Sequence, residues 1–277
     1  MNSTVDIPGM QQMDAETFDV IVIGAGLSGV GAAVRLQRDC PDRDFILLER
    51  REAIGGTWDL FRYPGIRSDS DMHTLGYDFK PWEAEKTIAD GPSILSYVNE
   101  TADEYRIRER IRFRQKLIAA DWSSERSQWQ LTVETPDGVR RYRCGFLMMC
   151  AGYYSYDQGY EPEFEGKASF SGEWVRPQFW PENLDHTDKT VVVIGSGATA
   201  MTLVPNMARR AKKVTMLQRS PTYVVSRPSV DGLANGLRRF LPPKLAYDIV
   251  RWRTTLWQQW MYKLSRIAPG VLKRTLL

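Results

Sequence analysis

Residues 20–29 read Val-Ile-Val-Ile-Gly-Ala-Gly-Leu-Ser-Gly, and residues 191–200 read Val-Val-Val-Ile-Gly-Ser-Gly-Ala-Thr-Ala. Each stretch joins four β-branched residues to a glycine-rich turn and then to small residues that suit a helix. Such a turn brings backbone N–H groups and the positive end of a helix dipole against a pyrophosphate, and glycine permits the close approach. One GxGxxG pattern is weak evidence. Two copies, each followed by a second strand at nearly the same spacing, predict two dinucleotide sites.

The first turn has the features of a site for an unphosphorylated dinucleotide. We expect the pyrophosphate to bind at Gly24, Gly26, Ser28 and Gly29. The next predicted strand, residues 45–48, ends at Glu49, where an acid accepts hydrogen bonds from an adenosine ribose. Because this carboxylate would repel a 2′-phosphate, FAD or NAD fits the first site.

The residues that follow the second turn differ from those that follow the first. We expect its pyrophosphate to bind at Gly195, Ser196, Gly197 and Thr199. The strand over residues 214–217 leads to Gln218, Arg219 and Ser220, so a guanidinium and a hydroxyl stand where the acid would be. Because a guanidinium matches the geometry of a phosphate, Arg219 and Ser220 favour NADP at the second site.

The composition suits a well-packed α/β protein. The 277 residues are 43% hydrophobic and 26% charged, which is enough for a large core in about two domains. Residues 1–17 are polar and have the character of a disordered leader without an apolar signal region. No run approaches the roughly 18 apolar residues of a membrane span, so we expect a cytoplasmic protein without a transmembrane segment.

Histidine and cysteine offer no sign of a metal or redox centre. The two histidines, His73 and His186, have no partner at ligand spacing, so we expect no protein metal site. Three cysteines lack zinc or redox spacing and are expected to be reduced structural thiols: Cys40, Cys144 and Cys150. A disulfide reductase with two dinucleotides is disfavoured because a CxxC-type pair is missing from the sequence.

The C-terminal stretch is unusually basic. Residues 231–277 hold nine Lys or Arg and two Asp, so they carry a formal charge of +7, while residues 1–230 carry −4. The stretch has helical character and contains Trp252, Trp257 and Trp260. A basic aromatic helix suits a membrane surface or a nucleic acid, but a helical subdomain that packs on another part of the protein is the commoner case. We expect no nucleic-acid partner, and at most a weak membrane-surface contact through residues 233–277.

Three further motifs stand out: Gly55-Gly56-Thr57-Trp58, the run Tyr63-Pro64-Gly65-Ile66-Arg67-Ser68-Asp69, and residues 170–181, which read FSGEWVRPQFWP. Together with the two glycine turns they resemble the flavin-containing monooxygenases, and specifically their Baeyer–Villiger branch. The last motif is similar to the fingerprint FxGxxxHxxxWP of that branch. Residues 56–72 are similar to the ethionamide-activating type found in mycobacteria and relatives, and the resemblance runs from about Phe18 to the C-terminus.

The resemblance implies an α/β fold with two Rossmann-like dinucleotide-binding domains, of which this sequence is an N-terminal portion. We expect an incomplete FAD-binding domain over residues 18–152, a linker over 153–189, and an incomplete NADP-binding domain over 190–277 with its helical basic end. Residues 51–82 have the character of ligand loops. The remaining patterns predict a helix over 92–110, a small antiparallel β layer over 120–150, and a buried strand over 146–150.

The resemblance also implies cofactors and chemistry. FAD would lie beside Gly56, Thr57 and Trp58, NADPH would bind the second site, and Asp69 would hold an active-site arginine near the isoalloxazine. Family members insert one oxygen atom of O₂ into ketones, or oxidise sulfur and nitrogen centres, through a C4a-peroxyflavin. The implied substrates are therefore small ketones, thioethers or thiocarbonyls.

Two departures from the family pattern leave alternatives open. The fingerprint His is Arg176 here, a permanent cation with hydrogen-bond donors only, so we expect weaker catalysis. Family members are also much longer, and the arginine that they place downstream has no match within residues 1–277. A working monooxygenase, a generic N- or S-oxygenating flavoprotein, and a catalytically silent FAD- and NADP-binding fragment all remain possible for this chain.

Overall fold

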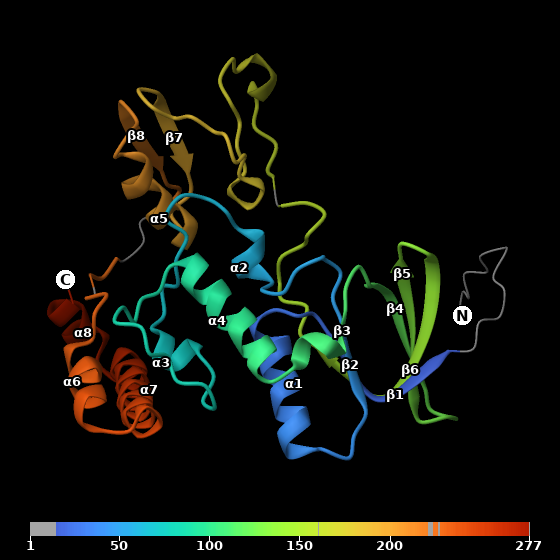
Figure 1. The fold of residues 1–277 in the computed structure, drawn as a ribbon. Helices are drawn as coiled ribbons and strands as arrows, with labels where there is room; N and C mark the ends of the chain where they lie inside the picture. Colours follow the sequence, from blue (N-terminus) through green and yellow to red (C-terminus); the bar gives the residue numbers. More distant parts are fainter. Residues whose placement is uncertain (1–14, 160, 221–223, 227, 277) are drawn as a thin grey trace. The chain divides into compact units, whose positions relative to one another are not determined.

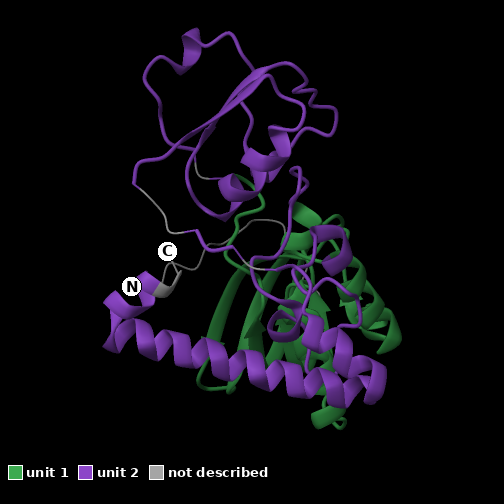
Figure 2. Cartoon of the chain, turned by 90° about the vertical axis from the view of Figure 1, so that its left-hand side faces the viewer, with its two compact units in different colours: residues 1–60, 95–158 green, residues 61–94, 159–277 purple. Residues whose placement is uncertain are grey.

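The chain divides into two compact units, which Figure 2 colours separately. Unit 1 contains residues 1–60 and 95–158, and unit 2 contains residues 61–94 and 159–277. The computed structural model describes residues 15–159, 161–220, 224–226 and 228–276. Most of the predicted leader, residues 1–14, thus lies outside the described residues.

Unit 1 is built on one six-stranded sheet in the order β3-β2-β1-β6-β5-β4 (Figure 1). Four strands run parallel: β1 (Glu16–Ile23), β2 (Phe45–Leu48), β3 (Ile111–Arg112) and β6 (Gly138–Met149). The other two, β4 (Lys116–Ser123) and β5 (Gln128–Thr135), continue the sheet in antiparallel fashion from β6. The predicted antiparallel strands are present, but they share β6 with the parallel sheet and so extend it instead of forming a separate layer.

The centre of the unit 1 sheet is apolar on both faces, as expected for parallel strands. Residues 20–23 of β1 and all four residues of β2 are buried. Helix α1 (Leu27–Asp39) contacts both strands and buries Gly29, Val30, Ala33 and Val34. The 3-10 helix η1 (Ile107–Arg110) contacts α1 and β2. The short helix α2 (Thr57–Leu60) also belongs to unit 1, whereas α4 (Gly91–Glu104) runs across the boundary between the two units.

Two sequence expectations for unit 1 were wrong. Residues 16 and 17 are not part of a leader, because they pair with Tyr142 and Arg143 in the sheet. The predicted buried strand over 146–150 is the end of β6, where Phe146 and Met149 are 56% and 59% exposed. An apolar run is buried only where a second layer covers it, and β6 mainly contacts its neighbouring strands β1 and β5.

Unit 2 contains a second β-α-β element. Strands β7 (Thr190–Ile194) and β8 (Lys213–Leu217) are parallel, and α5 (Ala198–Met207) connects and contacts them. One face of this two-stranded sheet is exposed at Val192, Ile194 and Leu217, so the apolar run over 191–194 is only partly buried. The α/β class with two β-α-β elements is confirmed.

The remaining helices of unit 2 include the predicted basic helical end, which is confirmed as helical. They are α3 (Met72–Leu75), η2 (Lys167–Ser169), η3 (Pro177–Phe179), α6 (Gly232–Phe240), α7 (Pro243–Ile267) and α8 (Pro269–Leu276). Helix α7 packs against α3 and α6 through Ala246, Tyr247, Val250 and Thr254. Its opposite side exposes six large apolar residues at helical spacing: Leu245, Ile249, Trp252, Leu256, Trp260 and Ile267.

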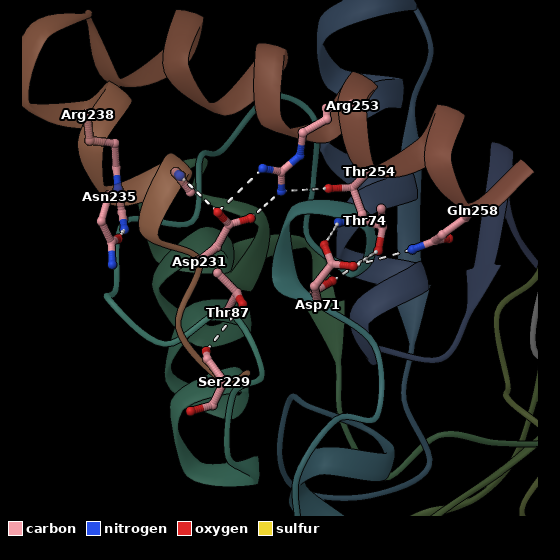
Figure 3. A network of polar contacts seen from close by, with 11 residues as sticks. Asp71, Thr74, Thr87, Ser229, Asp231, Asn235, Arg238, Arg253, Thr254 and Gln258 are labelled. Atoms are coloured by element: carbon pink, nitrogen blue, oxygen red, sulfur yellow. Dashed lines mark hydrogen bonds and ion pairs between the residues drawn. The ribbon is translucent and has the colours of Figure 1, made fainter. Parts of the chain in front are cut away.

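A polar network attaches α6 and α7 to the loops around α3 (Figure 3). Asp231 caps α6 by accepting a hydrogen bond from the Ala234 N–H at 3.0 Å, and it forms an ion pair with Arg253 of α7. Asp71 caps α3 through the Thr74 N–H at 3.1 Å and also meets Gln258 of α7. Two carboxylates at helix N-termini therefore fix α7 in place.

The first prediction concerns Asp231. Asp231→Ala removes a helix cap and a partly buried ion pair, so we expect a loss of about 1–2 kcal/mol in the free energy of unfolding. Burial raises the pKa of Asp231, but the hydrogen bonds from Arg253 and Ala234 outweigh it and leave the pKa below its ordinary value. Such a group stabilises the fold above its unfolded pKa, and the contribution is lost as pH falls through its folded pKa. Urea unfolding at neutral and acidic pH measures both effects.

The matched control is Asp248→Ala on α7. Among the described residues, Asp248 forms an ion pair with the exposed Lys244 one turn earlier, so this change should cost less than about 0.5 kcal/mol. Equal destabilisation by the two substitutions at neutral pH would contradict the role given to Asp231.

Candidate dinucleotide-binding loops

The first glycine loop makes a tight turn from β1 into α1. Gly24 has a φ of +103°, and its N–H donates to the Leu48 carbonyl of β2 at 2.8 Å. Gly26 is the N-cap residue of α1, with extended backbone at φ −79° and ψ −170°, and its carbonyl accepts from the Val30 N–H at 3.0 Å. The turn therefore ends the strand and starts the helix within three residues.

The second glycine loop repeats this geometry in unit 2. Gly195 has a φ of +127°, and its N–H donates to the Leu217 carbonyl of β8 at 2.8 Å. Gly197 is the N-cap residue of α5 at φ −78° and ψ −178°, and it accepts from the Met201 N–H at 3.0 Å. The two loops thus share their strand-to-strand hydrogen bond, their positive φ and their N-cap conformation.

Both helix N-termini fit an anion. Neither Gly26 nor Gly197 supplies a side-chain cap, and neither α1 nor α5 has an acidic residue in its first turn. The short helix α3 and helix α6 are instead capped by their own aspartates. The first-turn N–H groups of α1 and α5 are therefore suited to a pyrophosphate, which would supply the missing acceptors.

The two loops differ in how closely the helix approaches the strand. A Cβ atom at Gly24 would lie 2.5 Å from the Cys150 carbonyl oxygen, and one at Gly29 would overlap the Gly24 carbonyl oxygen. In the second loop, a Cβ at Gly195 would meet nothing within 4 Å, and the position equivalent to Gly29 is the buried Ala200. The first turn thus requires its glycines for packing. The second requires Gly195 for its positive φ alone.

Glu49 lies where the sequence placed it, at the end of β2 beside the first loop. Its carboxylate is only 2% exposed and accepts the Ala25 N–H at 2.7 Å and the Arg51 N–H at 2.8 Å, one on each oxygen. A carboxylate has about four lone-pair sites, so the same oxygens can also accept ribose hydroxyls. Glu49 therefore shapes the loop as well as offering a ribose ligand.

The Gly55-Gly56 turn lies against the first loop. The Gly55 N–H donates to the Ala25 carbonyl at 3.0 Å, and a Cβ at Gly26 would lie 3.5 Å from the Gly56 Cα atom. Thr57 and Trp58 follow directly on α2 and are half-buried. Ser28, by contrast, is exposed on the first turn of α1.

Sequence reasoning missed a charged cluster beside this turn. Arg51 pairs with Asp59 at 2.6 Å, and its guanidinium carbon lies 5.4 Å from the centre of the Tyr156 ring. Burial raises the pKa of Tyr156, and the Glu49 charge adds to that increase. No spacing rule could connect Tyr156 to residues about a hundred positions earlier in the sequence. Arg51 and Asp59 did have a sequence signal, because they flank the recognised GGTW motif.

The other residues predicted for the second loop lie on it or just beyond β8. Ser196 is half-buried between the two glycines, and Thr199 is on the first turn of α5. Arg219 and Ser220 are exposed two and three residues after the end of β8. The β-α-β topology therefore brings these side chains to the carboxyl end of the strands, where dinucleotides bind in such folds.

Asp69 is 57% exposed, and its carboxylate lies 4.0 Å from the Arg67 guanidinium. The buried carboxylate of this loop is instead Asp71, the N-cap of α3. The sequence offered a signal for Asp71, because Asp is among the residues preferred at a helix N-cap.

Arg176 sits in a small cluster of charges and rings in the fingerprint segment. It lies 3.2 Å from the Glu161 carboxylate and above the Phe179 ring, and it is the N-cap of η3. Lys167 pairs with the same carboxylate and lies over the Trp174 ring at 5.0 Å. The Arg176 side chain is thus held by an acidic partner. A neutral imidazole at this position could make the same contact only by donating an N–H.

The described residues contain neither a metal-binding cluster nor a membrane-spanning helix. No group of three or more His, Cys, Asp or Glu is arranged to hold a metal within the described ranges. Among those same residues, no helix combines the length and apolar character needed to cross a bilayer. Cys40, Cys144 and Cys150 are all free thiols.

The sequence matches known proteins over most of its length. The flavin-binding monooxygenase-like family model matches residues 17–255. The chain is 50% identical over 263 residues to the FAD-containing monooxygenase EthA of Mycolicibacterium smegmatis, and the match covers 95% of this chain and 54% of EthA. The chain thus spans about half the length of the curated relatives it matches.

Solved structures agree with the sequence match. The OTEMO complex with FAD and NADP has a TM-score of 0.66 and 31% identity, covering 76% of this chain and 41% of that chain. Cyclohexanone monooxygenase from Rhodococcus sp. Phi1 bound to NADP⁺ has a TM-score of 0.71 and 26% identity, covering 87% of this chain and 44% of that chain. With the family model matching nearly the whole described chain, the predicted family is confirmed: the chain belongs to the flavin-binding monooxygenase-like family.

Proposed function

We propose that this chain binds FAD at the first glycine loop and NADP(H) at the second, within an FAD- and NADPH-dependent monooxygenase. The observation that carries the proposal is the pair of strand-turn-helix loops with matching backbone geometry and no side-chain cap. EthA is named as an FAD-containing monooxygenase, and OTEMO is described with FAD and NADP. The name of EthA supports FAD as a cofactor, and the OTEMO complex supports a second site for NADP.

At the first site, the chain would bind and orient the flavin dinucleotide. The N–H groups of the Gly26 turn and the first turn of α1 would hold the pyrophosphate, and Glu49 would accept the ribose hydroxyls. The Gly55-Gly56 turn would place Thr57 and Trp58 toward the flavin side. When bound, FAD supplies hydride acceptance and oxygen activation, which the protein side chains cannot perform.

At the second site, the chain would select the phosphorylated nicotinamide cofactor. Gly195, Ser196, Gly197 and Thr199 would hold the pyrophosphate, and Arg219 with Ser220 would bind the 2′-phosphate. Asp69 would hold a positively charged group near the flavin. Arg176 would contribute to catalysis from the linker that joins the domains predicted at residues 18–152 and 190–277.

The substrate is proposed as a small ketone that receives one oxygen atom from O₂, or a thioether or thiocarbonyl that is oxidised at sulfur. The resemblance to the Baeyer–Villiger branch supports the ketone, and no charged substrate group is required. We also propose that the protein works in the cytoplasm, because its three cysteines are free thiols, the state that a reducing compartment maintains.

A catalytically silent binding fragment is the second candidate for the isolated chain. It is favoured by the apolar side chains of β6, β7 and β8 that stay exposed, such as Phe146, Val192 and Leu217. Such a chain would bind both dinucleotides without forming product.

The second prediction tests the function directly. The purified chain should retain yellow FAD, be bleached faster by NADPH than by NADH, and then convert a simple ketone or a thioether. Absorbance, stopped-flow reduction and product analysis measure these three steps. A colourless protein would contradict FAD binding, and reoxidation that yields only hydrogen peroxide would favour the silent fragment.

A companion variant, Arg176→His, restores the residue of the family fingerprint. If Arg176 limits turnover, this variant should form more product per NADPH consumed, while flavin content stays unchanged. Equal product yield in both proteins would remove Arg176 from the proposed catalytic residues.

The third prediction concerns cofactor choice. Arg219→Gln removes the guanidinium proposed to bind the 2′-phosphate, so the Kd for NADPH should rise about ten- to hundredfold while the Kd for NADH changes little. The matched control is Arg209→Gln, an exposed arginine just after α5. An unchanged preference in Arg219→Gln would contradict the assignment.

The fourth prediction concerns the weak membrane-surface contact proposed for residues 233–277. Residues 249–277 contain six Lys or Arg and no acidic residue, and Trp252 and Trp260 lie on the exposed apolar side of α7. Part of the chain should co-sediment with vesicles of anionic lipid. Replacing both tryptophans by serine should abolish this co-sedimentation. Equal sedimentation with neutral and anionic vesicles would contradict the contact.

A further inference from the structure

Two residues connect the carboxylate of Glu49 with the Gly55-Gly56 turn, and each of them binds both. Ala25 does so through its backbone: its N–H donates to one Glu49 oxygen at 2.7 Å, and its carbonyl accepts the Gly55 N–H at 3.0 Å. Arg51 donates its N–H to the other Glu49 oxygen at 2.8 Å, and its guanidinium donates to the Gly56 carbonyl at 3.4 Å. The second connection therefore depends on a side chain.

The turn needs such contacts because the helix that follows it is very short. Helix α2 has four residues, and isolated helices of this length are not stable in water. Gly55 and Gly56 have φ values of +125° and +55°, and glycine by itself holds no single conformation. The Gly56 carbonyl also accepts the N–H groups of Asp59 and Leu60 at 3.1 and 2.9 Å. A contact at this carbonyl therefore acts on the start of α2.

The Arg51 guanidinium also binds α2 directly. It pairs with Asp59 at 2.6 Å, and the two side chains are only 25% and 12% exposed. The centre of the Tyr156 ring lies 5.4 Å from the guanidinium carbon, and a Cβ at Gly56 would lie 3.9 Å from the Tyr156 hydroxyl oxygen. Because the pair is largely removed from water, it is screened less than a surface ion pair and holds α2 more firmly.

From these contacts we propose that Arg51 is a positioning residue for the flavin half of the first cofactor. Its backbone N–H fixes the carboxylate of Glu49, and its side chain fixes α2, which carries Thr57 and Trp58. The proposal rests on the FAD site proposed above. The Arg51 guanidinium touches no cofactor and acts through Asp59 and the Gly56 carbonyl.

The fifth prediction compares Arg51→Met with the wild type, using FAD and ADP as probes. ADP has the ribose and the pyrophosphate but no flavin, so it reports on Glu49 and the first glycine loop. Fluorescence titration of the flavin-free full chain gives the Kd for FAD, and displacement of FAD gives the Kd for ADP at the same site. The substitution keeps the backbone N–H at residue 51 and removes the guanidinium. The Kd for FAD should therefore rise about five- to twentyfold, while the Kd for ADP changes less than about twofold.

Further variants assign the effect to the ion pair. Asp59→Asn should raise the Kd for FAD by a similar factor, and adding it to Arg51→Met should weaken FAD binding no further, because both changes remove one contact. Arg51→Lys keeps the charge but not the planar fork, so it should recover only part of the affinity. The matched control is Arg114→Met, which removes a 57% exposed side chain that pairs with Glu52 at 2.8 Å and should bind FAD as the wild type does.

The two ligands separate positioning from damage to the fold. Equal weakening of FAD and ADP in Arg51→Met would overturn the proposal, because damage to the shared glycine loop affects both ligands. An unchanged Kd for FAD, or effects of Arg51→Met and Asp59→Asn that add, would overturn it as well, while the FAD site would stand. If the wild type binds neither ligand, the proposed FAD site and this inference fail together.

Discussion

The first nucleotide-binding element depends on how closely α1 approaches β1. Only the missing Cβ at Gly29 lets the first turn of the helix lie against the Gly24 carbonyl, and only the missing Cβ at Gly24 leaves room for the Cys150 carbonyl at the end of β6. This approach places the first-turn N–H groups of α1 at the edge where β1, β2 and β6 end, and it brings Glu49 within hydrogen-bond distance of Ala25. The turn and the proposed anion site thus depend on one packing constraint.

Four helices of this chain differ in what satisfies their N-termini. Helices α3 and α6 use Asp71 and Asp231, and both are structural elements that anchor α7. Helices α1 and α5 begin at glycines without a side-chain cap, and both follow the end of a parallel strand. An uncapped N-terminus costs stability unless an acceptor from outside the helix is supplied, so the N-termini of α1 and α5 suit an anionic ligand. Helix α7 also lacks a side-chain cap, but it begins with proline, which has no N–H group to satisfy.

Local patterns predicted the parts of the fold that local physics controls. Glycine turns after β-branched strands gave both β-α-β elements, and strand ends gave Glu49 and Arg219. Burial was predicted less well, because Phe146 and Val192 are apolar but need a second layer to cover them, which no strand pattern supplies. Contacts between distant segments were missed altogether: Tyr156 beside Arg51, and Asn206 beside Gly65. Such pairs depend on tertiary geometry that periodicity and spacing do not contain.

The YPGIRSD segment shows why a motif and its physical role need separate arguments. Its resemblance points to the flavin, yet within unit 2 its glycine is explained by α5, because a Cβ at Gly65 would overlap the side-chain amide of Asn206. Arg67 and Asp69 of the same segment stay 50% and 57% exposed. The contact between Gly65 and Asn206 therefore constrains this segment without any ligand, and the resemblance alone connects Asp69 with the flavin.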